Sequence, residues 1–215
     1  MLNQQNTSVT TGRVRLSYVH LFKPYAARPG QEEKYSTTIL IPKSDIDTKR
    51  RIDAAIQAAK EAGVSSKWNG VNPPQVAIPI YDGDGVRPSD GMPFGAECKG
   101  HWVMTASSNR QQPVVDVNLN PIINQTEVYS GMYARVNVNF FPYATGKIGV
   151  GAGLGPVQKL EDGEPLAGGM TVEQAFGSPV PQPIQQPTYQ QPTYQQPAPH
   201  YQQPQIDPIT GLPRI

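Results

Sequence analysis

The strongest constraint on the fold is a strict alternation of apolar and polar positions over residues 132–141. Ala134, Val136, Val138 and Phe140 occupy every second position, and polar or aromatic residues fill the places between them. Successive side chains of a strand point to opposite faces, so this pattern predicts a strand with one buried and one exposed face. Such a strand must bury its apolar face against further strands or a helix.

Weaker strand patterns along the first 160 residues predict a mainly β protein. They cover the ranges 13–22, 35–41, 76–81, 101–106 and 147–157. One helix is predicted in addition: Ser44 is placed to cap it, an apolar stripe runs from Ile46 to Ala59, and Gly63 is a typical stop. About six strands with one early helix and long loops favour an OB-fold-like Greek-key barrel.

The last 39 residues differ in composition from the rest of the chain. The range 177–215 contains ten prolines and ten glutamines and repeats Gln-Gln-Pro-Thr-Tyr at 185–189 and 190–194. So little apolar surface cannot offset the entropy lost on ordering, and proline cannot donate to a helix or sheet. We therefore expect four segments: a flexible N-terminus (1–11), an OB-fold-like DNA-binding domain (12–160), an acidic linker able to hold a short helix (161–176) and a disordered tail (177–215).

Charge is unevenly distributed along a chain whose formal net charge is only +1. Residues 1–160 carry 17 lysines and arginines against 12 acidic residues, whereas residues 161–215 carry one arginine against five acidic residues. The folded domain is therefore basic, which favours an anionic partner. No apolar run is long enough for a membrane span and the start lacks a signal-peptide pattern, so a cytoplasmic protein without a membrane partner is expected.

The motifs that suggest a cofactor or a metal fail on spacing. The glycines of 149–155 fit neither a dinucleotide fingerprint nor a phosphate loop, and alternate glycines instead mark a bare strand face that another group can approach. Cys98 and His101 have metal-like spacing, but two ligands cannot close a zinc site. Since no nucleophile elbow or carboxylate–histidine cluster appears either, we expect no cofactor, no metal and no enzymatic activity.

What remains is aromatic residues interleaved with basic ones, a combination that suits single-stranded nucleic acid. Flat rings stack with bases while cations follow the phosphates. The candidates for stacking are Trp102, Tyr133, Phe141 and Tyr143. The candidates for phosphate contacts are Arg13, Arg15, Lys23, Lys34, Arg110, Arg135 and Lys147.

Not every aromatic residue on a strand is expected at the surface. Tyr18 and Phe22 share the alternation of Val14 and Leu16, so the core is the expected place for both. Phe141 lies opposite the apolar stripe of its strand, so its ring is expected in solvent.

Several segments resemble a phage protein family long catalogued as a domain of unknown function. They are 12–18, 128–135, 139–143, 151–160 and 162–166, and the resemblance extends over residues 10–176. Its members are single-stranded-DNA-binding replication proteins with an OB-fold and a disordered C-terminal tail. The resemblance implies sequence-independent coating of exposed strands in phage DNA replication, recombination or repair, in the host cell cytoplasm.

The end of the chain regains aliphatic residues. Ile206, Ile209, Leu212 and Ile215 are predicted to dock onto a replication or recombination protein at the end of a flexible tether. Two other functions stay open: an RNA or oligosaccharide binder on the same fold, and a phage virion structural or assembly protein with a β-rich body.

Overall fold

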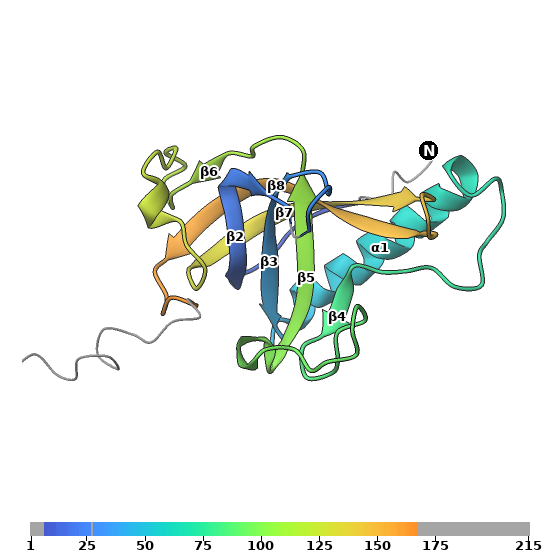
Figure 1. Ribbon diagram of the computed structural model, residues 1–215, viewed down its shortest axis with the longest axis horizontal. Coiled ribbons are helices and arrows are strands. Elements are labelled where there is room, and N and C mark those ends of the chain that lie inside the picture. Colours follow the sequence, from blue (N-terminus) through green and yellow to red (C-terminus); the bar gives the residue numbers. More distant parts are fainter. Residues whose placement is uncertain (1–6, 27, 167–215) are drawn as a thin grey trace, which may run out of the picture. The chain divides into compact units, whose positions relative to one another are not determined.

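The computed structural model describes residues 7–26 and 28–166, in which the strands form one eight-stranded sheet beside one long helix (Figure 1). The strands are β1 (Ser8–Thr10), β2 (Val14–Tyr25), β3 (Lys34–Pro42), β4 (Ile80–Asp82), β5 (His101–Ser108), β6 (Val114–Val115), β7 (Tyr133–Tyr143) and β8 (Gly149–Glu161). The helix is α1 (Ile46–Ser66), and the short 3-10 helices are η1 (Ala96–Cys98) and η2 (Gln125–Glu127).

Five of the strands are hydrogen-bonded in a ring, in the order β2, β3, β5, β8 and β7. The ring closes because β7 pairs with β8 on one side and with β2 on the other. The joint between β5 and β8 is parallel and consists of one residue pair, Ser107 with Gly153. The expected mainly β, OB-like fold is confirmed, but a single-pair joint makes the sheet a ring rather than a regular barrel.

The core fills the inside of this ring. The four apolar residues of the β7 alternation are at most 1% exposed, as the sequence predicts. Helix α1 adds Ile52, Ala55, Ile56 and Ala59 to the same cluster and packs against β7, β1 and β8. Removing this apolar surface from water supplies the main driving force for folding.

The ends of α1 differ from those predicted. Asp45 caps the helix instead of Ser44, because its carboxylate accepts a 3.0 Å hydrogen bond from the backbone N–H of Thr48. Gly63 lies inside the helix, where an added Cβ would be 2.7 Å from the ring of Trp68. Gly63 therefore permits close packing of Trp68 and does not end the helix.

The folded part extends beyond both ends of the expected domain 12–160. Before it, Ser8–Thr10 form β1. After it, the backbone N–H of Leu166 donates to the Ser130 carbonyl at 2.8 Å, and the Leu166 side chain packs with a cluster that contains Leu40 and Val103. Residues 162–166 thus belong to the body, whereas the expected tail 177–215 and the predicted docking residues Ile206, Ile209, Leu212 and Ile215 lie outside the described residues.

A membrane span was not expected from the sequence. In the part of the chain that the structure describes, no helix has the length and apolar character to cross a membrane.

Candidate nucleic-acid interface

The candidate interface is on the side of the sheet that points away from the core, which we call the outer face. On β3 and β5, Thr38 and Thr105 are register partners on this face, and their hydroxyl groups hydrogen-bond at 3.0 Å. Ser107, two residues further along β5, lies on the same face and is the register partner of Gly153 of β8. Since β8 pairs along its length with β7, the outer face runs from β5 across β8 to Phe141.

Phe141 and Tyr143 lie against the glycines of β8 on this face. A Cβ added to Gly151 would be 2.6 Å from the Phe141 ring, and one added to Gly149 would be 2.6 Å from a ring carbon of Tyr143. The two rings therefore pack on the bare strand face that the alternate glycines predict. One side of the Phe141 ring packs on Gly151, and the side chain is still 44% exposed. Such a ring suits a platform on which a base can stack.

Tyr133, at the other end of β7, has its ring covered. The Arg13 guanidinium carbon lies 3.5 Å from the ring centroid, and Arg13 also forms a 2.5 Å ion pair with Glu161. Arg15 approaches the same ring and donates to the Glu164 carbonyl at 2.6 Å. The ring and both arginines are therefore engaged with one another and with the segment that follows β8.

Trp102 does not share the face of Phe141. It packs against the core, and the ammonium groups of Lys43 and Lys49 lie 5.1 and 4.6 Å from its ring. Lys43 is held in turn by the carboxylates of Asp82 and Asp84, and its hydrogen bonds lower the pKa of both. The structure thus separates Trp102 from Phe141 and Tyr143 and places two lysine side chains against its half-buried ring.

The predicted phosphate contacts also divide into engaged and available residues. Lys23, Arg110 and Lys147 are exposed and form no ion pair with any of the residues that the structure describes. Lys147 lies in the turn between β7 and β8, four residues after Tyr143, and Arg110 follows the end of β5. Lys34 pairs with Glu32 at 3.3 Å, and the Arg135 side chain reaches the Thr11 carbonyl at 3.4 Å.

Sequence reasoning missed Tyr18, which is 64% exposed and not in the core. A register shift in β2 between Ser17 and His20 turns the chain at this residue, and Tyr18 adopts a left-handed φ of 48°. Alternation of apolar residues cannot reveal such a bulge. A non-glycine residue with positive φ is uncommon and often marks a functional position, whereas Phe22 packs against the core as expected.

Two further ring systems were not among the residues predicted to stack with bases. His20 and Tyr25 stack with ring centroids 4.4 Å apart and planes 9° apart, and burial lowers the pKa of His20. Tyr81 of β4 is 37% exposed. No local pattern indicates either feature, because each depends on which strands become neighbours.

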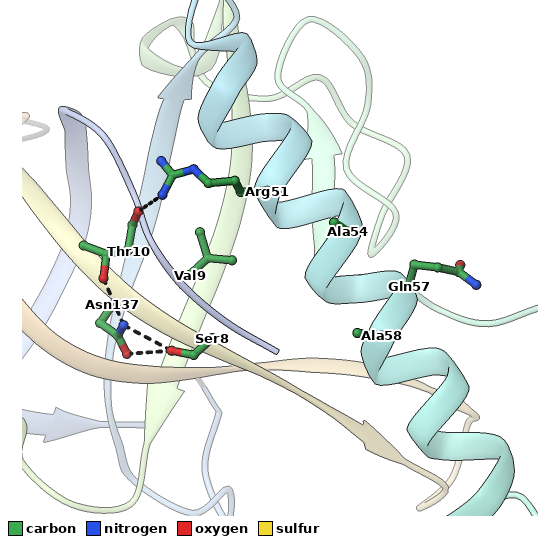
Figure 2. A pocket seen from close by; sticks show the side chains of 8 residues that line it. All are labelled: Ser8, Val9, Thr10, Arg51, Ala54, Gln57, Ala58 and Asn137. Atoms are coloured by element: carbon green, nitrogen blue, oxygen red, sulfur yellow. Dashed lines mark hydrogen bonds between the residues drawn. The ribbon is translucent and has the colours of Figure 1, made fainter. Parts of the chain in front are cut away.

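A cavity of about 750 Å³ lies away from these rings, between α1 and β1 (Figure 2). Arg51 donates to the Thr10 carbonyl at 2.8 Å, and the Asn137 amide donates to the Thr10 hydroxyl at 3.0 Å. The helical wall is formed by Arg51, Ala54, Gln57 and Ala58. The lining contains no aromatic ring and none of the predicted site residues, so the cavity is not part of the candidate interface.

Comparison with known proteins identifies the family. The family described as Enterobacter phage Enc34, ssDNA-binding protein, matches residues 7–185. The chain belongs to this family. A solved structure of the single-stranded DNA-binding protein from bacteriophage Enc34 in complex with ssDNA is 28% identical, with a TM-score of 0.64 over 75% of this chain and 90% of that chain. The phage family expected from the sequence is confirmed.

Two other known proteins extend the comparison beyond the Enc34 protein. Putative protein p50 of Acyrthosiphon pisum secondary endosymbiont phage 1 is 28% identical over 165 residues, which are 75% of this chain and 87% of that protein. The single-stranded DNA binding protein gp2.5 of bacteriophage T7 has a TM-score of 0.52 at 17% identity, over 75% of this chain and 90% of that chain. The likeness to gp2.5 is one of fold alone.

Proposed function

We propose that this protein binds single-stranded DNA on its outer face and coats exposed strands during phage DNA replication, recombination or repair. Membership in the Enc34 ssDNA-binding family is the observation that carries this function. The exposed ring of Phe141, seated on Gly151, supports the outer face as the binding surface.

Base stacking and phosphate contacts both contribute to the binding free energy. Bases stack on Phe141 and Tyr143, each for about 1–3 kcal/mol, and every base offers a flat face, so no sequence is read. Lys147, in the turn that follows Tyr143, and Arg110, after the end of β5, form no ion pair among the described residues, and they neutralise phosphates. The sequence-independent affinity then depends on salt.

The protein acts by binding, without catalysis. Within residues 7–26 and 28–166 no group of three or more His, Cys, Asp or Glu residues is placed to hold a metal ion. Burial, together with the neighbouring Glu97 carboxylate, raises the pKa of the Cys98 thiol to about 11. A thiol with this pKa is protonated at neutral pH and is a poor nucleophile.

The aliphatic end of the chain is the proposed contact for a second protein. Residues 206–215 follow a long stretch rich in proline and glutamine, a composition typical of a spacer that sets the effective concentration of its tip. Deleting 206–215 should abolish capture of a replication or recombination protein from infected cells while leaving DNA affinity unchanged. Retained capture would assign the contact to another part of the chain.

Titration with matched oligonucleotides tests the DNA-binding function. A single strand should bind much more tightly than a blunt duplex of equal length, and log affinity should fall with log salt by about 0.7 for each phosphate neutralised. Equal affinity for the duplex would leave only a basic patch and contradict stacking. Weak binding that does not respond to salt would favour the alternative, a virion structural or assembly protein.

A further inference from the structure

A second cavity, of about 350 Å³, opens on the outer face beside β4 and β5. Its lining combines rings, prolines and a few polar groups: Pro79, Tyr81, Arg87, Pro88, Ser89, Phe94, Val103 and Thr105. None of the residues predicted from the sequence to contact DNA lines it.

The sheet fixes the floor and one wall of this cavity. Tyr81 is the register partner of Val103, and the preceding residue, Ile80, is buried in the core and anchors β4. Phe94 is the second aromatic residue of the lining. Its side chain packs against the buried cluster of Leu40, Cys98 and Val103. Both rings are therefore held in place before any ligand binds.

The remaining wall is a loop with its own hydrogen bonds. The backbone N–H of Arg87 donates to the Met92 carbonyl at 2.8 Å, and that of Gly91 donates to the Arg87 carbonyl at 2.8 Å. The Arg87 guanidinium pairs with Asp90 at 3.0 Å. These contacts hold Arg87 and the two following residues at the rim.

The cavity lies near the proposed DNA surface. Ala77, four residues before Tyr81, is bridged to Gly149, and Gly149 lies beneath the ring of Tyr143. Tyr81 and Tyr143 are close enough to interact electrostatically: burial raises the pKa of Tyr81, and Tyr143 raises it further. Tyr81 thus stands between the cavity and the row formed by Phe141 and Tyr143.

The chemistry of the lining selects the ligand. Volumes near the lower end of the range for small-molecule sites suit a single compact group, and apolar walls with a few polar groups are typical of such sites. Tyr81 and Phe94 offer ring contacts to a planar heterocycle, while the hydroxyl groups of Thr105 and Ser89 offer hydrogen bonds to its edge. The lining holds no acidic residue, and its one charged residue is Arg87, which pairs with Asp90 at the rim.

We propose that this cavity receives one base of the bound strand, turned out of the row that stacks on Phe141 and Tyr143. The proposal rests on the proposed single-stranded-DNA binding and adds a subsite to it. Single-stranded DNA, unlike a duplex, can present an unpaired base without breaking pairs. The subsite therefore strengthens the preference for single strands and gives a modest preference among bases, because a cavity of fixed size cannot treat all bases alike.

Photocrosslinking on the full-length protein tests this subsite. A thymine oligonucleotide carrying 5-iodouracil would be bound, irradiated, and the adducts mapped by mass spectrometry. The matched variants are Ser89→Trp, which fills the cavity from its rim, and Met92→Ala, which changes an exposed residue of the same loop outside the lining. Tyr81→Ala removes a wall without filling the cavity, and thermal melting checks that all variants fold.

In the wild type we expect an adduct on Tyr81 or Phe94 in addition to adducts near Phe141. Ser89→Trp should abolish the adduct on Tyr81 or Phe94 and keep the adducts near Phe141. Its affinity for the oligonucleotide should be about fivefold lower or more. Tyr81→Ala should weaken binding to a similar extent, and Met92→Ala should leave adducts and affinity unchanged. Adducts confined to Phe141 and Tyr143, with wild-type affinity in Ser89→Trp, would overturn the subsite and leave DNA binding intact. Absence of any binding by the wild type would overturn both proposals.

Discussion

The two ends of β7 carry the same kinds of residue and differ in what remains available to a ligand. Near Tyr143, two aromatic rings rest on glycines, and the neighbouring Lys147 forms no ion pair within the described residues. Near Tyr133, an arginine covers the ring and is itself paired with Glu161. The first end offers rings and charge to a partner, whereas the second uses them to hold the chain together.

This difference shows that an aromatic residue beside a basic one is only potentially a nucleic-acid site. A cation that already pairs with a carboxylate has part of its charge neutralised within the protein, so it gains less from a phosphate than an unpaired cation does. The segment that covers Tyr133 is short: residues 162–166 bring the Glu164 carbonyl to Arg15 and the Leu166 side chain to the buried cluster near Leu40. On our proposal, this difference in covering places the DNA at the Tyr143 end.

Replacing one ring at each end should separate binding from stability, and this is the largest effect that we expect. Phe141→Ala should weaken single-stranded-DNA binding by about 1–3 kcal/mol and leave the melting temperature nearly unchanged, because the ring is exposed and is our proposed platform for a base. Tyr133→Ala should lower the melting temperature and leave affinity nearly unchanged. Fluorescence anisotropy and thermal melting measure the two quantities. If Phe141→Ala mainly lowers the melting temperature, our assignment of the two ends is inverted.

A substitution at the glycine beneath the Phe141 ring is a finer test than removal of the ring. Gly151→Ala would place a methyl group 2.6 Å from the Phe141 ring and force the ring to move. We expect affinity to fall by about 1 kcal/mol, less than on loss of the ring, because a displaced ring still stacks partly.

The matched control for this position is Gly153→Ala, whose Cβ would lie at an ordinary 3.6 Å from the same ring and 3.3 Å from the Asn139 carbonyl oxygen, a contact that a shift of a few tenths of an ångström relieves. The control should bind DNA like the wild type. Equal losses in both variants would show that the flexibility of β8, not the position of the ring, sets the affinity.

Single cation substitutions should affect the salt dependence unequally. Lys147→Gln should flatten the slope of log affinity against log salt by about 0.7, since one phosphate contact is lost. Arg13→Gln should leave the slope unchanged, because Arg13 is paired with Glu161. Titrations at several salt concentrations measure both slopes, and a flattened slope in Arg13→Gln alone would move the phosphate path to the Tyr133 end.

Acid should weaken the fold slightly through His20, the smallest effect on this scale. Burial lowers the pKa of His20 below its ordinary value near 6.5, so between the two values the unfolded chain binds more protons than the folded one. The free energy of unfolding should therefore fall as pH drops through this range. Urea titrations from pH 7.5 to 5.5 would show the slope, and His20→Gln should reduce it. An identical slope in the variant would assign the effect to other groups.

The sequence predicts the strands well and the surface less well. The alternation in β7 and the glycines of β8 identify a buried face and a bare one, and both are observed. Trp102 shows where such reasoning stops: its place beside Lys43 and Lys49 depends on α1 packing across the sheet, which no local pattern specifies.

Tyr18 and Tyr81 were missed for related physical reasons. The bulge in β2 reverses the face of Tyr18, and period-2 reasoning assumes that no residue is inserted. Tyr81 becomes a wall of a cavity only because β4 pairs with β5. Long-range pairing, rather than composition, places both rings.

The most direct test of the central claim observes the two ends of β7 in one sample. With 3-fluorotyrosine incorporated and resonances assigned by single Tyr→Phe variants, fluorine NMR can follow Tyr143 and Tyr133 while a thymine oligonucleotide is added. We predict that the Tyr143 resonance shifts on binding and that the Tyr133 resonance, beneath Arg13, stays in place. A shift at Tyr133 with no change at Tyr143 would contradict the assignment of single-stranded DNA to the Tyr143 end of the outer face.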